Sequence, residues 1–342
     1  MPENRVVVGV VPRERWSLSV ESLHSLLATL PEGVPFVYVD GGSPDSIAAE
    51  LRPTVEAAGG RYLRFDFVMS CQEARNVIVA EAGDVEYVVF AENDVAFRPG
   101  WLEALVDCAD ETGAGAVQPL VFMGEDDDTE LIHIGYGNIE INDGVLDVNY
   151  HEHEWDVASE VPEQTRRPTR QMEFHTFLAR KAMLDEIGPF DERIRSIGDH
   201  EDLVLLADQA GWELYYEPAS QVVFRQFVKL TPEDRGFWQL HWSEDWIQPS
   251  LDHFARKWDV HPNQGWLDLA RRWSSQRRTW WYHGQGPVVS TVGKVWRRIL
   301  LNPRTPGAVR ELEYRIFARP AQAEHDRRGA AINASPEYGF QP

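Results

Sequence analysis

Apolar and polar residues in the first 120 positions alternate between two spacings. Runs of apolar, largely β-branched residues predict strands at residues 5–11, 35–40, 61–65, 86–91 and 115–119. Between these runs, apolar positions at helical spacing predict helices at 17–30, 45–58, 71–82 and 99–111. Strands that alternate with helices of this length form right-handed βαβ units. We therefore predict an α/β fold with a Rossmann-like, mainly parallel sheet flanked by helices.

The alternation stops after residue 120. Residues 123–170 include the acidic run Glu125–Asp128 and several turn signals, which predict a small antiparallel portion and a mobile loop. The pattern then predicts ordered structure at 171–187, a helix at 201–210 and a strand at 212–216. We expect Pro218 to end that strand, because proline removes a donor from the ladder.

From residue 231 onward the chain is rich in tryptophan and has helical patterns with paired arginines. The last segment is polar and without periodicity, which is typical of a disordered tail. We therefore expect one domain at 1–230 with halves 1–119 and 120–230, a helical extension at 231–320 and a disordered tail at 321–342.

Composition narrows the class of protein. The 342 residues include 33 basic and 55 acidic side chains, for a formal net charge of −22. Since phosphate backbones attract clustered Lys and Arg, this charge argues against a nucleic-acid partner. The two cysteines, Cys71 and Cys108, form no motif and fit a reduced, cytoplasmic protein. We see no signal peptide, and no apolar run approaches the ~20 residues that span a bilayer.

Acidic residues follow two of the predicted strands. Glu92-Asn93-Asp94 comes directly after the strand at 86–91. Two carboxylates one residue apart are suitable ligands for a hard divalent cation such as Mn²⁺ or Mg²⁺, with phosphate oxygens in the remaining positions. Ligands of parallel sheets bind beyond the carboxyl ends of the strands, so this segment and Asp40, after the strand at 35–40, are expected near one another.

Asp40 opens a glycine turn, Asp40-Gly41-Gly42-Ser43, ahead of the helix at 45–58. The glycines allow a ligand to approach the backbone, and the free amides of a helix start favour an anion. Asp40 is therefore a candidate to accept hydrogen bonds from a nucleobase or a ribose. Asp and Gly are also the ordinary residues of a βα turn, so a purely structural role explains the segment as well.

Four segments resemble, in order, motifs of the family-two glycosyltransferases. V-D-G-G-S-P-D at 39–45 is similar to the family's V-D-D/N-G-S-x-D, and E-N-D-V at 92–95 resembles its D-x-D segment. F-L-A-R-K-A-M-L-D-E-I-G-P-F-D-E at 177–192 resembles its R-R to G-x-F-D-E signature. G-D-H-E-D-L at 198–203 resembles the acidic helix start that follows. The resemblance covers about residues 5 to 225.

This resemblance implies a GT-A fold and transfer of a sugar from a nucleotide-diphosphate donor to a hydroxyl acceptor, in glycan or glycoconjugate biosynthesis. It also implies a divalent metal cofactor, Mn²⁺ or Mg²⁺, and usually inversion at the anomeric carbon. UDP-sugar is the default donor, with GDP- and dTDP-sugars as alternatives. The acceptor would be a glycan, a lipid-linked glycan or a small molecule.

Matched position by position, the resemblance also implies site residues. Asp94 corresponds to the usual direct metal ligand, and Glu92 to the acid that faces the ribose or the water shell of the metal. Arg75-Asn76 matches the A-R-N motif, whose arginine helps to hold the donor. The implied donor-binding set is Asp40, Gly41, Arg75, Glu92 and Asn93.

The acids after Gly198 would supply the catalytic base. Inverting transfer needs a carboxylate that takes the acceptor's hydroxyl proton on the face opposite the leaving group. The register of the motif leaves Asp202, Asp199 and Glu201 open, in that order of preference. Each of them is also the kind of acid that stabilises a helix N-terminus.

Two positions depart from the family's pattern. The metal pair is Glu-x-Asp instead of Asp-x-Asp, and Phe224 stands where many relatives have a third, histidine ligand. Phenylalanine cannot coordinate a metal. Among the histidines in nearby sequence we select His175, directly before the F-L-A-R strand, as the candidate to complete the metal site.

Three further interpretations remain open. A non-catalytic GT-A domain that binds nucleotide sugar or glycan is the alternative function, and Phe224 is the reason for it. A nucleotidyltransferase ranks third, because residues 10–15 lack a glycine-rich loop for a triphosphate. Residues 288–301 form a basic amphipathic helix that either contacts a membrane surface peripherally or covers the core.

Overall fold

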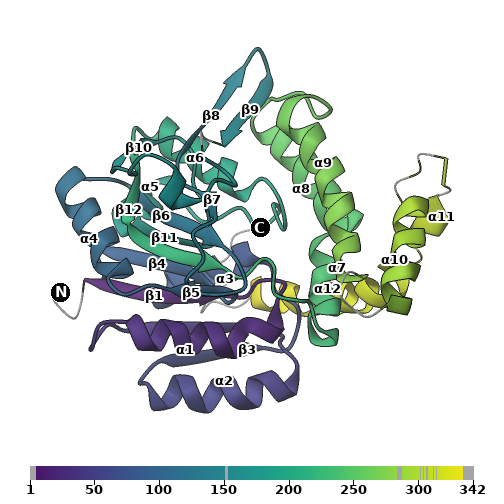
Figure 1. Ribbon diagram of the computed structural model, residues 1–342, viewed down its shortest axis with the longest axis horizontal. Helices are drawn as coiled ribbons and strands as arrows, with labels where there is room; N and C mark the ends of the chain where they lie inside the picture. Colours follow the sequence, from purple (N-terminus) through teal and green to yellow (C-terminus); the bar gives the residue numbers. More distant parts are fainter. Residues whose placement is uncertain are drawn as a thin grey trace.

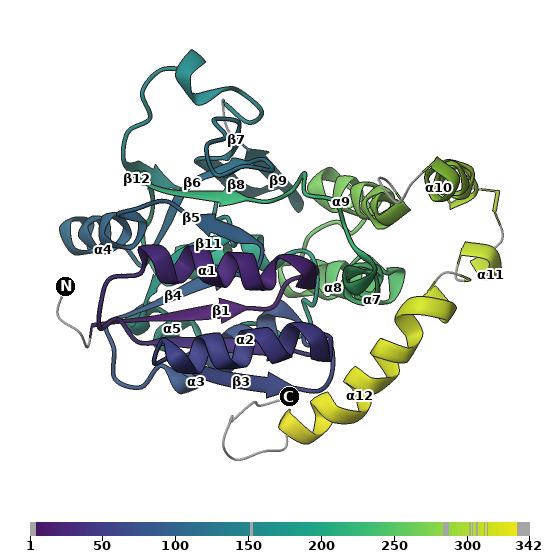
Figure 2. The same ribbon diagram turned by 60° about the horizontal axis from the view of Figure 1, so that its bottom comes forward.

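The computed structural model describes residues 5–150, 153–282, 287–300, 302, 304–305, 307–310, 312 and 314–333. An α/β body forms most of the molecule, and the C-terminal helices stand beside it, at the right in Figure 1. Figure 2 shows helices α1 and α2 on the near face of the sheet.

The first half of the chain forms the parallel part of a ten-stranded sheet. Its strands have the order β4-β1-β2-β3, and all neighbouring pairs are parallel. The bounds are β1 (Val6–Val11), β2 (Phe36–Gly41), β3 (Arg61–Phe65) and β4 (Tyr87–Glu92). These strands agree with the predicted ones to within a few residues, because buried apolar runs between helices leave little ambiguity.

The second half adds strands of mixed direction. β11 pairs antiparallel with β4 and β6, β12 runs parallel to β6, and β8 and β9 form a separate hairpin. The bounds are β5 (Val95–Phe97), β6 (Ala116–Met123), β7 (Ile132–Ile134), β8 (Gly137–Asn142), β9 (Val145–Tyr150), β10 (Arg167–Thr169), β11 (Thr176–Arg180) and β12 (Leu214–Phe224). The predicted fold class, a mainly parallel sheet with a small antiparallel portion, is confirmed.

Alternate residues of the central strand β1 serve two helical layers. Val6, Val8 and Val10 pack with α1, α2 and α4, whereas Val7 and Val11 pack on the other side with α3 and α6. The helices are α1 (Ser19–Thr29), α2 (Asp45–Ala57), α3 (Cys71–Glu81), α4 (Trp101–Thr112), α5 (Lys181–Ile187) and α6 (Asp199–Gln209). The sheet is therefore buried on both faces, and ligands reach it at its ends.

The prediction for β12 was wrong at its C-terminal end. Pro218 does not end the strand, because a register shift between Glu217 and Gln221 accommodates the proline and pairing with β6 resumes. The strand continues to Phe224, which pairs with Val95 of β5. This extension carries position 224 to the same edge of the sheet as the end of β4.

The C-terminal region is helical, as predicted. Its helices are α7 (Arg235–His241), α8 (Glu244–Lys257), α9 (Gly265–Arg277), α10 (Pro287–Leu300), α11 (Gly307–Arg310) and α12 (Arg319–Asn333). Trp238, Trp242 and Trp246 are buried and hold α7 and α8 in place. Among the described residues, no helix is long and apolar enough to cross a membrane.

The prediction of a disordered tail was wrong for residues 321–333, because these residues belong to helix α12. His325 contacts both carboxylate oxygens of Glu73 at 2.9 and 3.0 Å, and Gln322 accepts a hydrogen bond from the indole of Trp246. These partners are far away in the sequence, so the polar composition of the tail gave no sign of them. Residues 334–342 lie outside the described part of the chain.

Candidate active site

Two acids and a histidine lie together where β4 ends. Ligand atoms of Glu92, Asp94 and His175 lie within 4.8 Å of one another, and all three residues are buried. Glu92 is the last residue of β4, and its amide donates to the carbonyl of His175, just before β11. The antiparallel pairing of β11 with β4 therefore brings the imidazole to the acidic segment.

Asp94 is the member of this group whose buried carboxylate receives no hydrogen bond from the described residues. It is fully buried, and within the described part of the chain neither carboxylate oxygen has a hydrogen-bond partner. Burial and the neighbouring Glu92 raise the pKa of Asp94 to about 7. A buried carboxylate is stable only when it is paired or coordinates a metal, so these residues fit a divalent cation.

Glu92 and His175 are bound to each other, with 2.7 Å between Oε2 and Nδ1. Arg75 and Arg13 approach the other oxygen of Glu92 at 3.3 and 3.4 Å. Although burial opposes ionisation, Arg13, His175 and Arg75 hold the pKa of Glu92 well below its usual range. Against the same opposing effect of burial, Glu173 and Glu92 raise the pKa of His175.

Phe224 occupies the position of the missing histidine ligand and packs directly on His175. The two rings are stacked, with 3.8 Å between centroids and 23° between planes. His133 lies 5.4 Å from His175 and 5.6 Å from Phe224, and it forms a second possible ligand group with Glu173 and His175. An imidazole is thus available at this edge of the sheet, from the segment before β11 instead of the end of β12.

Arg75 connects the acidic segment to the start of α6. Its guanidinium donates to Asp199 at 2.9 Å and to Glu92 at 3.3 Å, and it lies 4.4 Å from the ring centre of Phe174. Its neighbour Asn76 binds the backbone of Phe190. The A-R-N segment therefore does two jobs, since Arg75 faces the candidate site and Asn76 anchors the loop before α6.

Asp40 is buried at the end of β2, and its partners come from its own turn and from β3. Its oxygens accept hydrogen bonds from the Ser43 amide at 2.8 Å, from the Ser43 hydroxyl at 2.9 Å and from the Tyr62 hydroxyl. Gly42 has φ +92°, and a Cβ at that position would lie 2.4 Å from the carbonyl oxygen of Phe67. The turn therefore requires glycine at 42 for structural reasons.

The three acids after Gly198 have different surroundings. Asp199 is paired with Arg75, and both oxygens of Asp202 accept hydrogen bonds at 2.8 Å, one from Lys257 and one from the Trp258 indole. Burial raises the pKa of Asp202, whereas His200, Arg75 and Arg13 overcome burial and lower the pKa of Asp199. Glu201 is buried near them in the first turn of α6.

Asn93, which lies between the two acids in sequence, fixes this segment to residues that follow β1. Its side chain accepts a hydrogen bond from the Arg13 amide and donates one to the Ser19 hydroxyl, both at 2.7 Å.

The sequence prediction missed Arg13 and Glu14, which follow β1 and form an ion pair of 2.7 Å beside Glu92. Their position directly after a central strand was the available signal.

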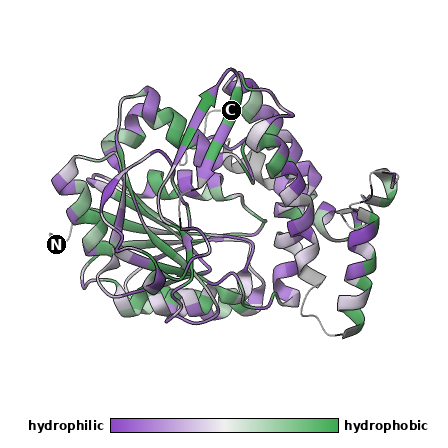
Figure 3. Ribbon diagram, turned by 45° about the horizontal axis from the view of Figure 1, so that its top comes forward, coloured by the Kyte–Doolittle hydropathy of each residue, from purple (hydrophilic) through white to green (hydrophobic). Residues whose placement is uncertain are grey.

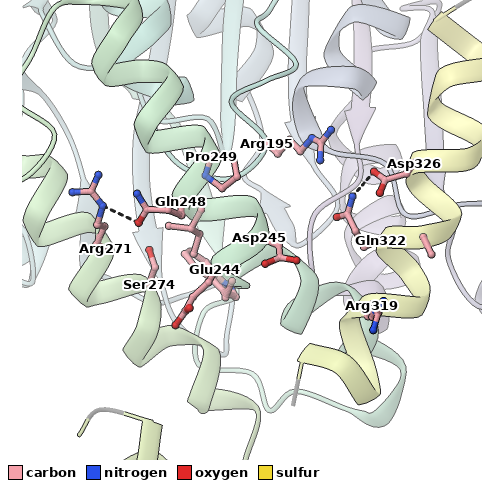
Figure 4. Close-up of a pocket in the computed structure, with 13 residues that line it drawn as sticks. Arg195, Glu244, Asp245, Gln248, Pro249, Arg271, Ser274, Arg319, Gln322 and Asp326 are labelled. Carbon is pink, nitrogen blue, oxygen red and sulfur yellow. Dashed lines mark hydrogen bonds between the residues drawn. The ribbon is translucent and has the colours of Figure 1, made fainter. Parts of the chain in front are cut away.

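The acidic group lies apart from a large groove among the C-terminal helices. This groove has a volume of about 880 Å³ and lies between α8, α9 and α12. Figure 4 shows charged and amide side chains around it, among them Arg195, Glu244, Gln248 and Arg271. None of the residues that line this groove is Glu92, Asp94 or His175, the three residues of the candidate metal group.

Comparison with known proteins agrees with this architecture. The sequence model described as glycosyl transferase family 2 matches residues 9–187, just over half of the chain. An N-acetylglucosaminyl-diphospho-decaprenol L-rhamnosyltransferase of Mycobacterium tuberculosis is 26% identical over 223 residues, which are 59% of this chain and 69% of that protein. The crystal structure of GalNAc-T7 with UDP, GalNAc and Mn²⁺ superposes with a TM-score of 0.54 at 16% identity.

That superposition covers 85% of this chain but about half, 53%, of the GalNAc-T7 chain, and it supports the fold alone. The mainly parallel sheet, with acids at the end of β4 and at the start of α6, has the GT-A fold, and the family model identifies the protein on this fold as a glycosyltransferase. The chain belongs to glycosyl transferase family 2.

Proposed function

We propose that the protein transfers a sugar from a nucleotide-diphosphate donor, by default a UDP-sugar, to a hydroxyl acceptor with inversion and with the help of a divalent cation. The unpartnered, buried carboxylate of Asp94 beside Glu92 and His175 is the observation that carries this proposal. Asp94, Glu92 and His175 hold the cation, which when bound neutralises negative charge on the diphosphate. His175 replaces the usual histidine ligand at position 224.

The donor side of the site is built from Asp40, Gly41, Arg75 and Asn93. Arg75 holds a positive charge beside Glu92, and Asp199 fixes its guanidinium. The turn at Asp40 and Gly41 lies at the end of β2, and β2 and β4 both flank β1. In this arrangement Asp40 contacts the nucleoside and Asn93 keeps the acidic segment attached to the Arg13 backbone.

Asp202 is the base that we propose for the acceptor hydroxyl. Lys257 and Trp258 fix the orientation of its carboxylate, and its raised pKa makes it a better proton acceptor than Asp199. Asp202→Asn should keep donor binding and lower transfer by about 10²- to 10⁴-fold. In the wild type, transfer should decline toward acid pH before an ordinary aspartate would be protonated, and Asp202→Asn should lose this acid limb.

The most direct experiment is a thermal-shift panel of UDP-, GDP-, dTDP- and CMP-sugars with and without Mn²⁺. A donor that binds the folded protein stabilises it by mass action. We expect a shift that requires both the metal and one nucleotide sugar, and its absence in Asp94→Ala. A complete lack of metal-dependent shifts in the wild type would count against the site. Repeating the panel with Mg²⁺ and comparing the shifts shows which of the two ions the protein prefers.

We further propose a lipid-linked acceptor, because the rhamnosyltransferase relative is named for one. Helix α10 supports a peripheral membrane contact: Val288, Val292 and Val295 are exposed on one face, next to Lys294 and Arg298. Figure 3 shows this helix apart from the α/β body. The local positive charge contrasts with the net charge of −22 and suits an anionic lipid surface.

Vesicle co-sedimentation tests this contact. The protein should sediment with vesicles that contain phosphatidylglycerol and less with pure phosphatidylcholine. Val292→Asp should abolish sedimentation, whereas Leu269→Asp, at an exposed position of α9, should not. Equal sedimentation of the two variants would show that α10 is not the contact.

A further inference from the structure

Two exposed aromatic rings lie side by side on the α/β body. Among the described tryptophan and phenylalanine side chains only Trp155, Phe227 and Trp273 are exposed, and Trp273 packs on Trp242 and Arg277. Trp155 is 52% exposed and Phe227 is 42% exposed, with 6.4 Å and 41° between their rings. Neighbouring exposed apolar groups from separate loops are typical of a binding surface.

The backbone at Trp155 is held in an unfavourable conformation. Its φ is +73°, which bulky L-residues rarely adopt and which costs on the order of 1–3 kcal/mol. Two hydrogen bonds of 2.9 Å compensate, from the Trp155 amide to the Ile132 carbonyl and from the Ile132 amide to the Asp156 carbonyl. Strain of this kind concentrates at functional sites, and here it presents the indole to solvent.

The loop of Phe227 is fixed by a buried arginine. Arg15 donates to the carbonyls of Arg225 and Gln226 at 2.7 and 3.0 Å, and to that of Val228. One buried guanidinium therefore holds three carbonyls on either side of Phe227, while the Phe227 ring stays exposed. Both rings thus belong to segments whose backbone is held by hydrogen bonds to the body of the protein, which reduces the entropy lost when a ligand binds.

Both segments are connected to residues that pack around His175, the segment of Phe227 along the chain and that of Trp155 through its hydrogen bonds to Ile132. Phe224, three residues before Phe227, stacks on His175, and His133, next to Ile132, lies 5.4 Å from it. Glu173 lies 3.6 Å from the His175 ring and 3.7 Å from His200 at the start of α6. Each ring is therefore connected, through Phe224 or through Ile132 and His133, to the residues that surround His175.

We propose that Trp155 and Phe227 form a platform on which a neutral pyranose ring of the acceptor stacks before its hydroxyl is glycosylated. The apolar C–H face of a pyranose suits an aromatic surface, and its equatorial hydroxyls stay free for transfer. This inference rests on the proposed function, because it assigns the acceptor side of the same site.

The test measures donor hydrolysis and sugar transfer separately, with alkyl-diphospho-N-acetylglucosamine as the acceptor and the nucleotide sugar that gives the largest thermal shift. In Trp155→Ala and Phe227→Ala, the acceptor KM should rise roughly ten- to hundredfold. The donor KM and the rate of donor hydrolysis should stay within about twofold of the wild type. Trp155→Phe should recover most of the acceptor affinity, because it keeps an aromatic face.

Leu269→Ala is the matched control, since it removes an exposed apolar side chain on α9 without touching the platform. An unchanged acceptor KM in both alanine variants would overturn the proposal, as would an equal loss of donor hydrolysis. A raised acceptor KM in Glu244→Ala alone would place the acceptor in the groove of Figure 4 instead.

Failure of the proposed function has a different signature, in which the wild type neither hydrolyses nor transfers from any donor. Saturation-transfer NMR with the same acceptor compound then decides about the platform by itself. Binding to the wild type that weakens in Trp155→Ala supports it. Binding that is absent, or equal in the two proteins, contradicts it.

Discussion

The ends of β2 and β4 each carry a buried acid, and the two acids are stabilised in different ways. Asp40, at the end of β2, accepts three hydrogen bonds from Ser43 and Tyr62. Asp94, just beyond β4, accepts none from the described residues and has a pKa raised to about 7. Both acids are buried at strand ends that flank β1, so burial and position alone do not distinguish them.

The difference indicates that Asp40 is required by the fold, whereas Asp94 is required by the chemistry of a bound cation. A carboxylate that bonds to its own turn stabilises the fold whether or not a ligand is present. A buried carboxylate without donors destabilises the fold by itself and becomes favourable when a cation binds. Substitutions at the two ends should therefore have opposite effects on stability, and this contrast can be measured.

The largest effect is expected for Asp94→Asn. Transfer should fall by at least about a hundredfold, because the metal loses its direct charged ligand. Without metal, the free energy of unfolding should rise by about 1–3 kcal/mol, since a buried charge is removed. Urea unfolding with a chelator and transfer assays with Mn²⁺ measure the two effects. A variant that is less stable than the wild type without metal would contradict our interpretation of Asp94.

His175→Ala should have the next largest effect. The concentration of Mn²⁺ needed for half-maximal activity should rise about 10- to 100-fold, as is usual when one partner of a metal site is removed. Because Phe224 stacks on His175, the double variant His175→Ala, Phe224→His returns an imidazole to this edge and should recover part of the affinity. A metal titration followed by activity compares the variants, and an unchanged Mn²⁺ requirement in His175→Ala would remove His175 from the metal site.

At the other strand end, Asp40→Asn should destabilise the protein. The amide accepts fewer of the hydrogen bonds from Ser43 and Tyr62, so the free energy of unfolding should fall by about 1–3 kcal/mol. If Asp40 also contacts the nucleoside, the donor KM should rise about tenfold with kcat little changed. Stability loss with an unchanged donor KM would leave Asp40 with its structural role alone.

These two strand ends also show how far sequence reasoning reaches. Both were predicted, because buried apolar runs locate the strands and parallel strands present their carboxyl ends at one edge. His175 was selected because it precedes a strand, and the pairing of β11 with β4 brings it to Glu92. Where the strands are regular, the sequence therefore predicts both the type of the site residues and the edge of the sheet at which they meet.

The partners of these residues were not predictable in the same way. That Tyr62 donates to Asp40, and that Lys257 and Trp258 hold Asp202, depends on side-chain packing between segments distant in sequence. The extension of β12 past Pro218 likewise depends on a register shift that local rules do not predict. Sequence patterns locate the acids, whereas only the packed structure tells which of them have partners.

The smallest effect, and the finest test of the comparison, is expected for Ser43→Ala. The variant removes the hydroxyl that donates to Asp40 at 2.9 Å but keeps the amide that donates at 2.8 Å. The free energy of unfolding should fall by about 1 kcal/mol, and the donor KM should stay within about threefold of the wild type. Thermal unfolding and donor titration give the two values. A donor KM that rises as much as in Asp40→Asn would mean that the turn positions Asp40 for the nucleoside, and that the β2 end is as much a binding element as the β4 end.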